Sequence, residues 1–228
     1  MLILVTGPAQ MLAEFQERFG EPEEIVYHTV EALPQAELLK ANAVFDFWLD
    51  SLPERMLQYQ RLDGLMLFCN VPKLSLAELL FRYGRPSCAL AGFNGLPGFV
   101  NRPLLELSLL EQKDLPQLQE VCKALGADFR LVQDRVGMVT PRVVCQIINE
   151  AYFTVQEGTA SREDIDLGMQ LGTNYPMGPF AWCNKIGVKH VYELLLAVLM
   201  DTGDERYRIC PLLKREYLLQ EASEKASM

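Results

Sequence analysis

The feature that most constrains the fold is a change of hydrophobic period close to Gly137. Before Gly137, short apolar runs alternate with amphipathic segments, a pattern typical of a parallel sheet whose strands are joined by crossover helices. After it, apolar residues recur at helical spacing. We therefore predict an α/β domain over residues 1–133 and an all-helical domain over residues 134–228.

Seven segments of the first domain are predicted to be strands, because they are short apolar runs bounded by turn signals. They cover residues 2–6, 24–29, 43–47, 64–70, 87–93, 104–110 and 128–132. The helix before the last strand ends at Gly126, a residue that favours helix C-termini. About thirteen residues separate the second and third strands, so this connection has no room for a long helical insertion.

The second domain begins with a long predicted helix. Thr140 is expected to be its N-cap, Pro141 its first residue and Gly158 its stop. A second helix is capped by Ser161, and a third starts near Gly187. A last helix covers the segment "PLLKREYLLQEASEK".

The stretch "NYPMGPFAW" at 174–182 interrupts this helical region. Pro176 and Pro179 lack amide donors, and a glycine such as Gly178 can adopt dihedral angles closed to other residues. The segment must therefore turn rather than continue a helix, and we interpret it as a structural corner.

Charge and hydropathy exclude several partners. The net charge is −9 and the basic residues are scattered, so no nucleic-acid partner is expected. The apolar start "MLILVTGPAQ" is too short to span a bilayer and is predicted to be a strand, so no membrane association is expected.

The cysteines are widely spaced and form no CxxC pair. In a chain of this size this spacing predicts buried, reduced thiols, a cytoplasmic location and no metal site. The six residues are Cys69, Cys88, Cys122, Cys145, Cys183 and Cys210.

The segment "NEAYFTVQEGTASREDIDLGMQLGTNYPMGPFAWCNKIG" (149–187) resembles the C-terminal domain of the 3-hydroxyacyl-CoA dehydrogenases, whose pattern contains NEA, an EG-x-AS-x-EDID stretch, PMGPF and IG. "CNVPKLSLAELL" (69–80) is similar to the family's NTSSLSI-type loop, and "GFNGLPGFVNRPLLELS" (92–108) to its HFFNP segment. The resemblance implies a Rossmann-like first domain that holds NAD. It also implies a helical domain that forms a homodimer and closes over an acyl-CoA.

The turn after the first strand departs from the usual dinucleotide pattern. Gly7 matches the first glycine of that pattern, but Ala9 and Leu12 stand where the second and third are needed. The second strand ends in Tyr27–Thr29 without the usual carboxylate, and Glu31 comes late. We therefore expect a reduced Rossmann-like domain that binds no cofactor.

The catalytic positions implied by the resemblance are mostly substituted. The family's Ser falls on Pro72, its His on Ala91 and its Asn on Pro141, none of which can do the same chemistry. Glu106 is the retained position, although it comes about three residues later than the family spacing.

Other polar and aromatic residues of the chain are candidates to replace these groups. We expect both histidines to be structural, the carboxylates near strand ends to be solvated, and the aromatic residues to belong to the core, with a pocket-lining role for Trp48 as the alternative. These residues are His28, His190, Asp46, Asp50, Phe45, Phe47 and Trp48.

We predict the first of three functions and keep the other two as alternatives. The first is a catalytically degenerate dimer that binds an acyl-CoA-like ligand or a protein partner. The second is an active NAD-dependent 3-hydroxyacyl-CoA oxidoreductase of fatty-acid metabolism with a non-standard site. The third is an assembly subunit that contacts a true dehydrogenase.

Overall fold

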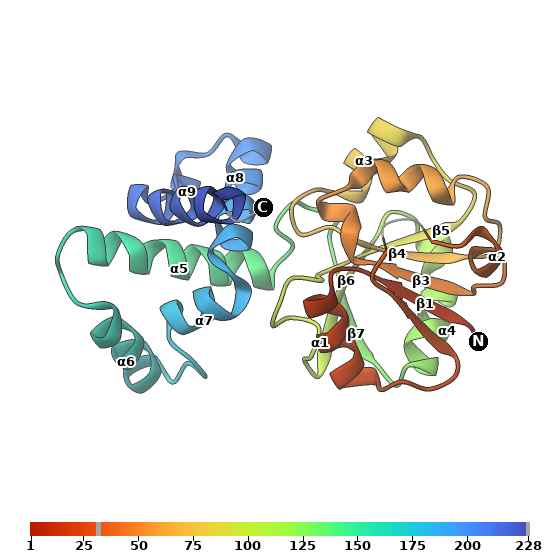
Figure 1. Cartoon of the computed structure of the whole chain (residues 1–228), viewed down its shortest axis with the longest axis horizontal. Helices are drawn as coiled ribbons and strands as arrows, with labels where there is room; N and C mark the ends of the chain where they lie inside the picture. The colour runs from red at the N-terminus through yellow and green to blue at the C-terminus, as the bar shows by residue number, and fades with distance from the viewer. Residues whose placement is uncertain (31–32, 227–228) are drawn as a thin grey trace. The chain divides into compact units, whose positions relative to one another are not determined.

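The computed structural model describes residues 1–30 and 33–226, so Glu31 lies outside the described residues. The chain forms two compact units, Met1–Met138 and Val139–Met228 (Figure 1). This division falls five residues after the boundary expected from the sequence. Each unit is described separately below.

The first unit is built on a seven-stranded sheet in the order β2-β1-β3-β4-β5-β6-β7. All seven segments predicted as strands form strands, and the first five are parallel, whereas β6 runs antiparallel to β5 and parallel to β7. The strands are β1 (Ile3–Thr6), β2 (Ile25–His28), β3 (Ala43–Asp46), β4 (Met66–Asn70), β5 (Ala89–Phe93), β6 (Leu104–Leu109) and β7 (Asp128–Val132).

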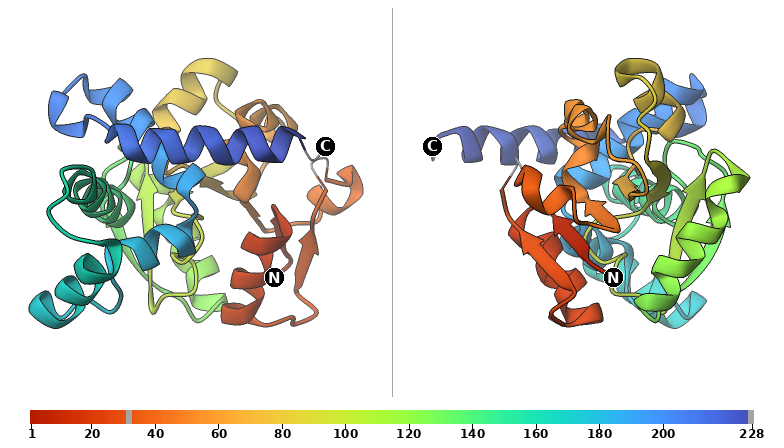
Figure 2. Two further views of the ribbon diagram at one scale, coloured as in Figure 1. Left: turned by 60° about the vertical axis from the view of Figure 1, so that its left-hand side comes forward. Right: turned by 90° about the vertical axis from the view of Figure 1, so that its right-hand side faces the viewer.

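Helices cover both faces of this sheet, as Figures 1 and 2 show. One face packs against α1 and α4, and the opposite face packs against α2, α3 and the 3-10 helix η2. Two-sided burial explains why the central strands are apolar up to their last residues. The helical elements are α1 (Ala9–Phe19), α2 (Gln35–Leu38), η1 (Phe47–Asp50), η2 (Pro53–Tyr59), α3 (Leu76–Tyr83), η3 (Gln112–Asp114) and α4 (Leu115–Ala124).

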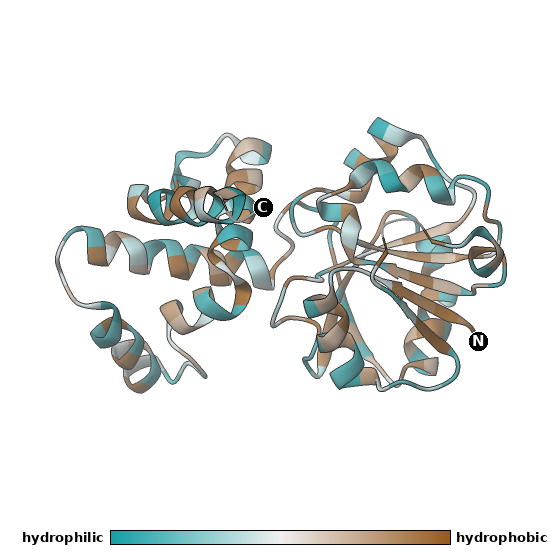
Figure 3. Cartoon of the chain, in the orientation of Figure 1, coloured by the Kyte–Doolittle hydropathy of each residue, from teal (hydrophilic) through white to brown (hydrophobic). Residues whose placement is uncertain are grey.

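The second unit is all helical, as predicted. It contains α5 (Thr140–Gln156), α6 (Arg162–Thr173), α7 (Pro179–Ile186), α8 (Val188–Thr202), η4 (Glu205–Tyr207) and α9 (Pro211–Ala226). Apolar and polar positions alternate around these helices (Figure 3). Within the described part of the chain, none of the helices is long and apolar enough to cross a membrane.

Two local predictions for this unit need correction. Thr140 is the first residue of α5 rather than its cap, because Val139 occupies the N-cap position. The sequence also predicted no helix within the corner, yet α7 begins there, with Pro179 at its first position. Proline is well suited to that position because its missing N–H has no partner inside a helix.

The corner is held by one carboxylate. Asp166 of α6 accepts hydrogen bonds from the backbone N–H groups of Phe180, at 2.8 Å, and Ala181, at 3.0 Å, at the start of α7. A Cβ on Gly178 would lie 2.2 Å from the Asp166 Cγ, so only glycine fits there. The EDID and PMGPF segments are therefore two halves of one joint between helices.

All six cysteines are free and buried, as the sequence predicted. Burial raises the pKa of the Cys183 thiol to about 11 and that of Cys88 to about 12. No cluster of three or more metal-binding side chains occurs among residues 1–30 and 33–226.

Candidate functional site at the carboxyl edge of the sheet

The strand order changes direction at β1, which pairs with β2 on one side and with β3 on the other. In open α/β sheets, ligands bind at the carboxyl ends of the strands beside such a switch point. Here β1 runs through Thr6 into Gly7 and α1, whereas β3 runs through Asp46 into η1. The loops that follow β1, β3, β4 and β5 therefore form the candidate site.

Phe47 packs between two glycines at this switch point. A Cβ on Gly7 would lie 2.6 Å from the Phe47 Cβ, and one on Gly95 would lie 2.7 Å from its Cδ1. Phe47 is 1% exposed, and its ring centroid is 4.9 Å from that of Phe93. The absence of a side chain at Gly7 therefore accommodates Phe47, which belongs to the core as expected.

The two residues that replace the other glycines of the dinucleotide pattern have different environments. Leu12, a residue of α1, is 3% exposed and packs in the core between this helix and the sheet. Ala9 is exposed at the first position of α1. Leu12 thus sets the spacing between helix and sheet, and the first turn of α1 stays accessible.

A carboxylate lies beside the end of β2, although Tyr27–Thr29 contain none. The Oε2 atom of Glu37, a residue of α2, is 2.8 Å from the His28 Nε2 atom. The Glu37 side chain is 40% exposed. Glu37 therefore places beside His28 an acidic side chain that the residues ending β2 do not supply. The sequence carried no signal for this contact, because a separate one-turn helix brings Glu37 to His28.

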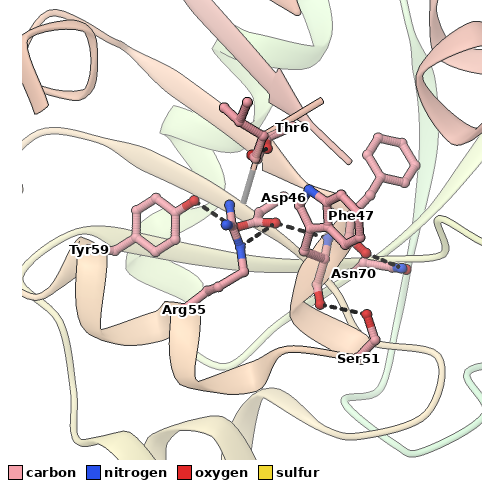
Figure 4. Close-up of polar contacts among 9 residues, drawn as sticks. Thr6, Asp46, Phe47, Ser51, Arg55, Tyr59 and Asn70 are labelled. Carbon is pink, nitrogen blue, oxygen red and sulfur yellow. Dashed lines mark hydrogen bonds and ion pairs between the residues drawn. The ribbon is translucent and has the colours of Figure 1, made fainter. Parts of the chain in front are cut away.

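A buried polar network follows β3 (Figure 4). The Asp46 carboxylate accepts hydrogen bonds from Arg55 Nε at 2.9 Å, from the Tyr59 hydroxyl at 2.6 Å and from the Trp48 backbone N–H at 2.9 Å. Burial raises the pKa of Asp46, and Arg55 and Tyr59 oppose that rise. The expectation that Asp46 is solvated is wrong, since it is fully buried and anchors η2 to β3.

Asn70 connects the ends of three neighbouring strands. Its side-chain nitrogen donates to the Phe47 carbonyl at 3.1 Å, and its side-chain oxygen accepts from the Gly95 backbone N–H at 2.8 Å. Asn70 is completely buried. The edge of the sheet is therefore held rigidly by a side chain that sequence reasoning did not single out.

A second buried ion pair lies at the same edge. The Lys73 ammonium nitrogen is 3.0 Å from the Asp50 Oδ2, and the two side chains are 10% and 3% exposed. Asp50 is thus not solvated as expected, and Lys73 was not predicted. The Trp48 Nε1, two residues before Asp50, is buried without an acceptor among the described residues.

The positions implied by the family resemblance do not converge in this unit. Ala91 is fully buried in the sheet and pairs with Phe68 and Leu109. It faces the same core as Leu107, so the neighbouring Glu106 projects from the opposite face of the sheet. A base at position 91 would therefore point away from Glu106.

The remaining predicted residues lie in both units. Pro72 is buried in the loop after β4, and its carbonyl accepts from the Gly137 backbone N–H at 2.8 Å. Pro141 is buried in α5 and His190 lies on α8, so both belong to the helical unit. Phe45 is 1% exposed and stacks on Phe68, as expected of a core residue.

The second unit matches a known protein family. Residues 137–227 match the model of the 3-hydroxyacyl-CoA dehydrogenase C-terminal domain. The 3-hydroxyadipyl-CoA dehydrogenase of Escherichia coli (strain K12) is 44% identical over 99 residues, which make up 43% of this chain and 21% of that protein.

Other similarities extend over the first unit. The probable 3-hydroxybutyryl-CoA dehydrogenase of Bacillus subtilis (strain 168) is 26% identical over 217 residues, covering 90% of this chain and 76% of that protein. The crystal structure of Mycobacterium tuberculosis FadB2 shares the fold with a TM-score of 0.77 at 18% identity, covering 97% of this chain and 94% of that chain. Residues 137–227 thus match the 3-hydroxyacyl-CoA dehydrogenase C-terminal domain, and the chain as a whole shares the fold of FadB2.

Proposed function

We propose that this protein is an NAD-dependent oxidoreductase that acts on 3-hydroxyacyl-CoA thioesters through a site that departs from the family pattern. The substrate class is supported by relatives named 3-hydroxyadipyl-CoA and 3-hydroxybutyryl-CoA dehydrogenases. The structural observation that carries the cofactor part is Glu37, whose carboxylate stands at the end of β2. A carboxylate at that point is the group that binds a nucleotide ribose in dinucleotide-binding folds.

The residues around β1 and β2 fit the adenosine half of NAD. Glu37 would accept hydrogen bonds from the ribose hydroxyls, and the accessible first turn of α1 at Ala9 would face the pyrophosphate. Gly7 leaves room for Phe47 beside this turn. When bound, NAD supplies the acceptor for a hydride from C3 of the substrate.

A second candidate function is binding of an acyl-CoA thioester without turnover. The observation that favours it is Ala91, which is fully buried at the position where the resemblance implies a base. A positioned base contributes a rate factor of about a hundred to ten thousand, so its loss removes most of the turnover. The proposed helical homodimer could serve either function.

One experiment separates the two candidates. Purified protein is mixed with (S)-3-hydroxybutyryl-CoA and NAD, and NADH is followed at its absorbance band, while NAD binding is measured by calorimetry. Steady NADH formation supports the oxidoreductase. Binding of the thioester without NADH formation and without NAD binding supports the second candidate.

A substitution tests the role of Glu37. Glu37→Gln removes the charge from a partly exposed side chain, and we expect NAD affinity to fall about ten- to a hundredfold, as for the loss of a hydrogen bond to a charged group. Glu120→Gln, on the exposed surface of α4, is the matched control and should leave affinity unchanged. Equal NAD affinity in wild type and Glu37→Gln would remove Glu37 from the cofactor site.

A further inference from the structure

A hollow on the helical unit is lined by one face of α5 and by η4. Its volume is about 530 Å³, and all of its lining residues belong to this unit. The α5 residues that line it lie between 142 and 150 and recur three or four positions apart, so they share one face of the helix. The hollow is therefore a feature of the helical unit by itself.

Gln146 provides a buried donor at this hollow. Its side-chain nitrogen Nε2 is buried and has no hydrogen-bond partner among the described residues. A buried amide N–H without an acceptor costs free energy, so native proteins leave very few of them. Because Gln146 lines the hollow, an acceptor that enters the hollow is the group able to satisfy this nitrogen.

Two guanidinium groups stand around the same hollow. The Arg206 Cζ is 4.7 Å from the ring centre of Tyr207, and the Arg206 Nε pairs with Asp204 at 3.1 Å. Arg142 donates from Nη1 to the Tyr207 hydroxyl at 3.2 Å, so the buried Tyr207 contacts both arginines. Glu150 contributes one negative charge to the lining, against the two positive charges of the arginines. The lining therefore favours an anion.

Apolar side chains complete the wall of the hollow. Val143 is 54% exposed, and Ile147, one turn further along α5, is partly buried. Ligand sites typically combine such apolar walls with a few polar groups that fix the ligand's orientation. Exposed apolar surface beside positive charge suits a ligand with an anionic head and an aliphatic body.

A carboxylate fits these groups better than a phosphate. A phosphoryl group carries a charge of about −1.5 to −2 at neutral pH, and the lining residue Glu150 repels it more strongly than it repels a single charge. A carboxylate carries one charge and two acceptor oxygens, which match the planar donors of a guanidinium group. Its aliphatic chain also covers the apolar wall, which inorganic phosphate leaves in water.

We propose that this hollow of the helical unit binds a small aliphatic carboxylate. Arg206 and the Gln146 Nε2 donate to the carboxylate oxygens. The aliphatic chain contacts Val143 and Ile147. Because every one of these residues belongs to the helical unit, the inference goes beyond the proposed oxidoreductase and does not depend on it.

The test is calorimetric binding of hexanoate to wild type and variants, with hexanol and inorganic phosphate as control ligands. Wild type should bind hexanoate more tightly than either control ligand. We expect Arg206→Met to weaken hexanoate binding about tenfold, as for the loss of a hydrogen bond to a charged group. Arg215→Met, at an exposed arginine of α9, is the matched control and should leave the affinity unchanged.

Gln146→Met adds a measurement that a purely structural role would move the other way. It removes the buried donor while keeping a side chain of similar length, so hexanoate binding should weaken about two- to tenfold. The same change removes an unsatisfied buried group, so the thermal midpoint of the ligand-free protein should rise. Near-ultraviolet circular dichroism establishes that each variant keeps its packing.

Each remaining outcome counts against the inference. Equal binding of hexanoate and hexanol would reduce the hollow to an apolar contact, and tighter binding of phosphate would overturn the choice of a carboxylate. Unchanged hexanoate affinity in a folded Arg206→Met, or no hexanoate binding by wild type, would overturn the site. A lower midpoint of Gln146→Met would show that Gln146 serves the fold instead. None of these results affects NADH formation, so the proposed function is tested separately.

Discussion

The joint between α6 and α7 gives a sharp test of how the helical unit is held. Gly178→Ala adds a single methyl group at a buried position. That Cβ would lie 2.2 Å from the Asp166 Cγ, 2.3 Å from its Oδ1 and 2.4 Å from its Cα. Because a backbone atom is among the three, a rotamer change of Asp166 cannot relieve the clash.

The magnitude follows from two contributions. Carbon atoms pack at about 3.5–4.0 Å, so α6 and α7 must separate by about an ångström. Overpacking of this kind costs about 1–3 kcal/mol. The separation also lengthens the bonds from Phe180 and Ala181 to Asp166, and the loss of a helix cap costs about 0.5–2 kcal/mol. We expect Gly178→Ala to lower the free energy of unfolding of the helical unit by about 1.5–5 kcal/mol in all.

Differential scanning calorimetry is the suitable assay because it resolves separate transitions of two units. In a unit of this size, 1 kcal/mol shifts the midpoint by about 4–8 °C, so the helical transition should fall by at least about 6 °C. Gly168→Ala and Gly172→Ala are matched controls, since a Cβ at either position in α6 meets no atom within 4 Å.

The controls should move the other way. Alanine is favoured over glycine inside a helix by about 0.5–1 kcal/mol, so both controls should raise the midpoint. In an Asp166→Ala background part of the clash is gone, and Gly178→Ala should cost less than it does alone. A Gly178→Ala midpoint equal to those of the controls would refute the claim that this glycine and Asp166 form the joint.

Three further predictions concern charge, thiols and assembly. Arg55→Met leaves the Asp46 carboxylate buried without its countercharge and should lower the free energy of unfolding by about 3–5 kcal/mol. A denaturant titration measures this loss, which should exceed that of the double variant Asp46→Asn/Arg55→Met. Burial raises the pKa of Cys183 to about 11. In the unfolded chain this thiol ionises already near pH 8.5, so the free energy of unfolding should fall between that pH and about 11. The expected slope is about 1.4 kcal/mol per pH unit for each such thiol, and the free energy of unfolding of Cys183→Ala should fall less steeply. Leu196 and Met200 of α8 are 38% and 77% exposed one turn apart, and we expect a homodimer through the helical unit that Met200→Lys dissociates. Light scattering at micromolar concentration measures this, and a monomeric wild type would contradict it.

The amino-acid sequence by itself determined the architecture of both units. Strands that are buried on both faces must be apolar throughout, and helices that are buried on one face must be apolar at helical spacing. These two periods are local properties, so all seven strands and the change to helices near Gly137 could be predicted. The motif at the corner could be recognised too, because its residues are close together in the chain.

The candidate site, in contrast, depended on contacts between residues distant in the sequence. Glu37 reaches the end of β2 from a separate helix, and Lys73 meets Asp50 across two loops. Asp46 was expected in solvent, but Arg55 and Tyr59 arrive from the following helix and enclose it. Periodicity and motif spacing cannot predict such contacts. The electrostatic and hydrogen-bond energies of these contacts depend on distances that are set only when the sheet is assembled.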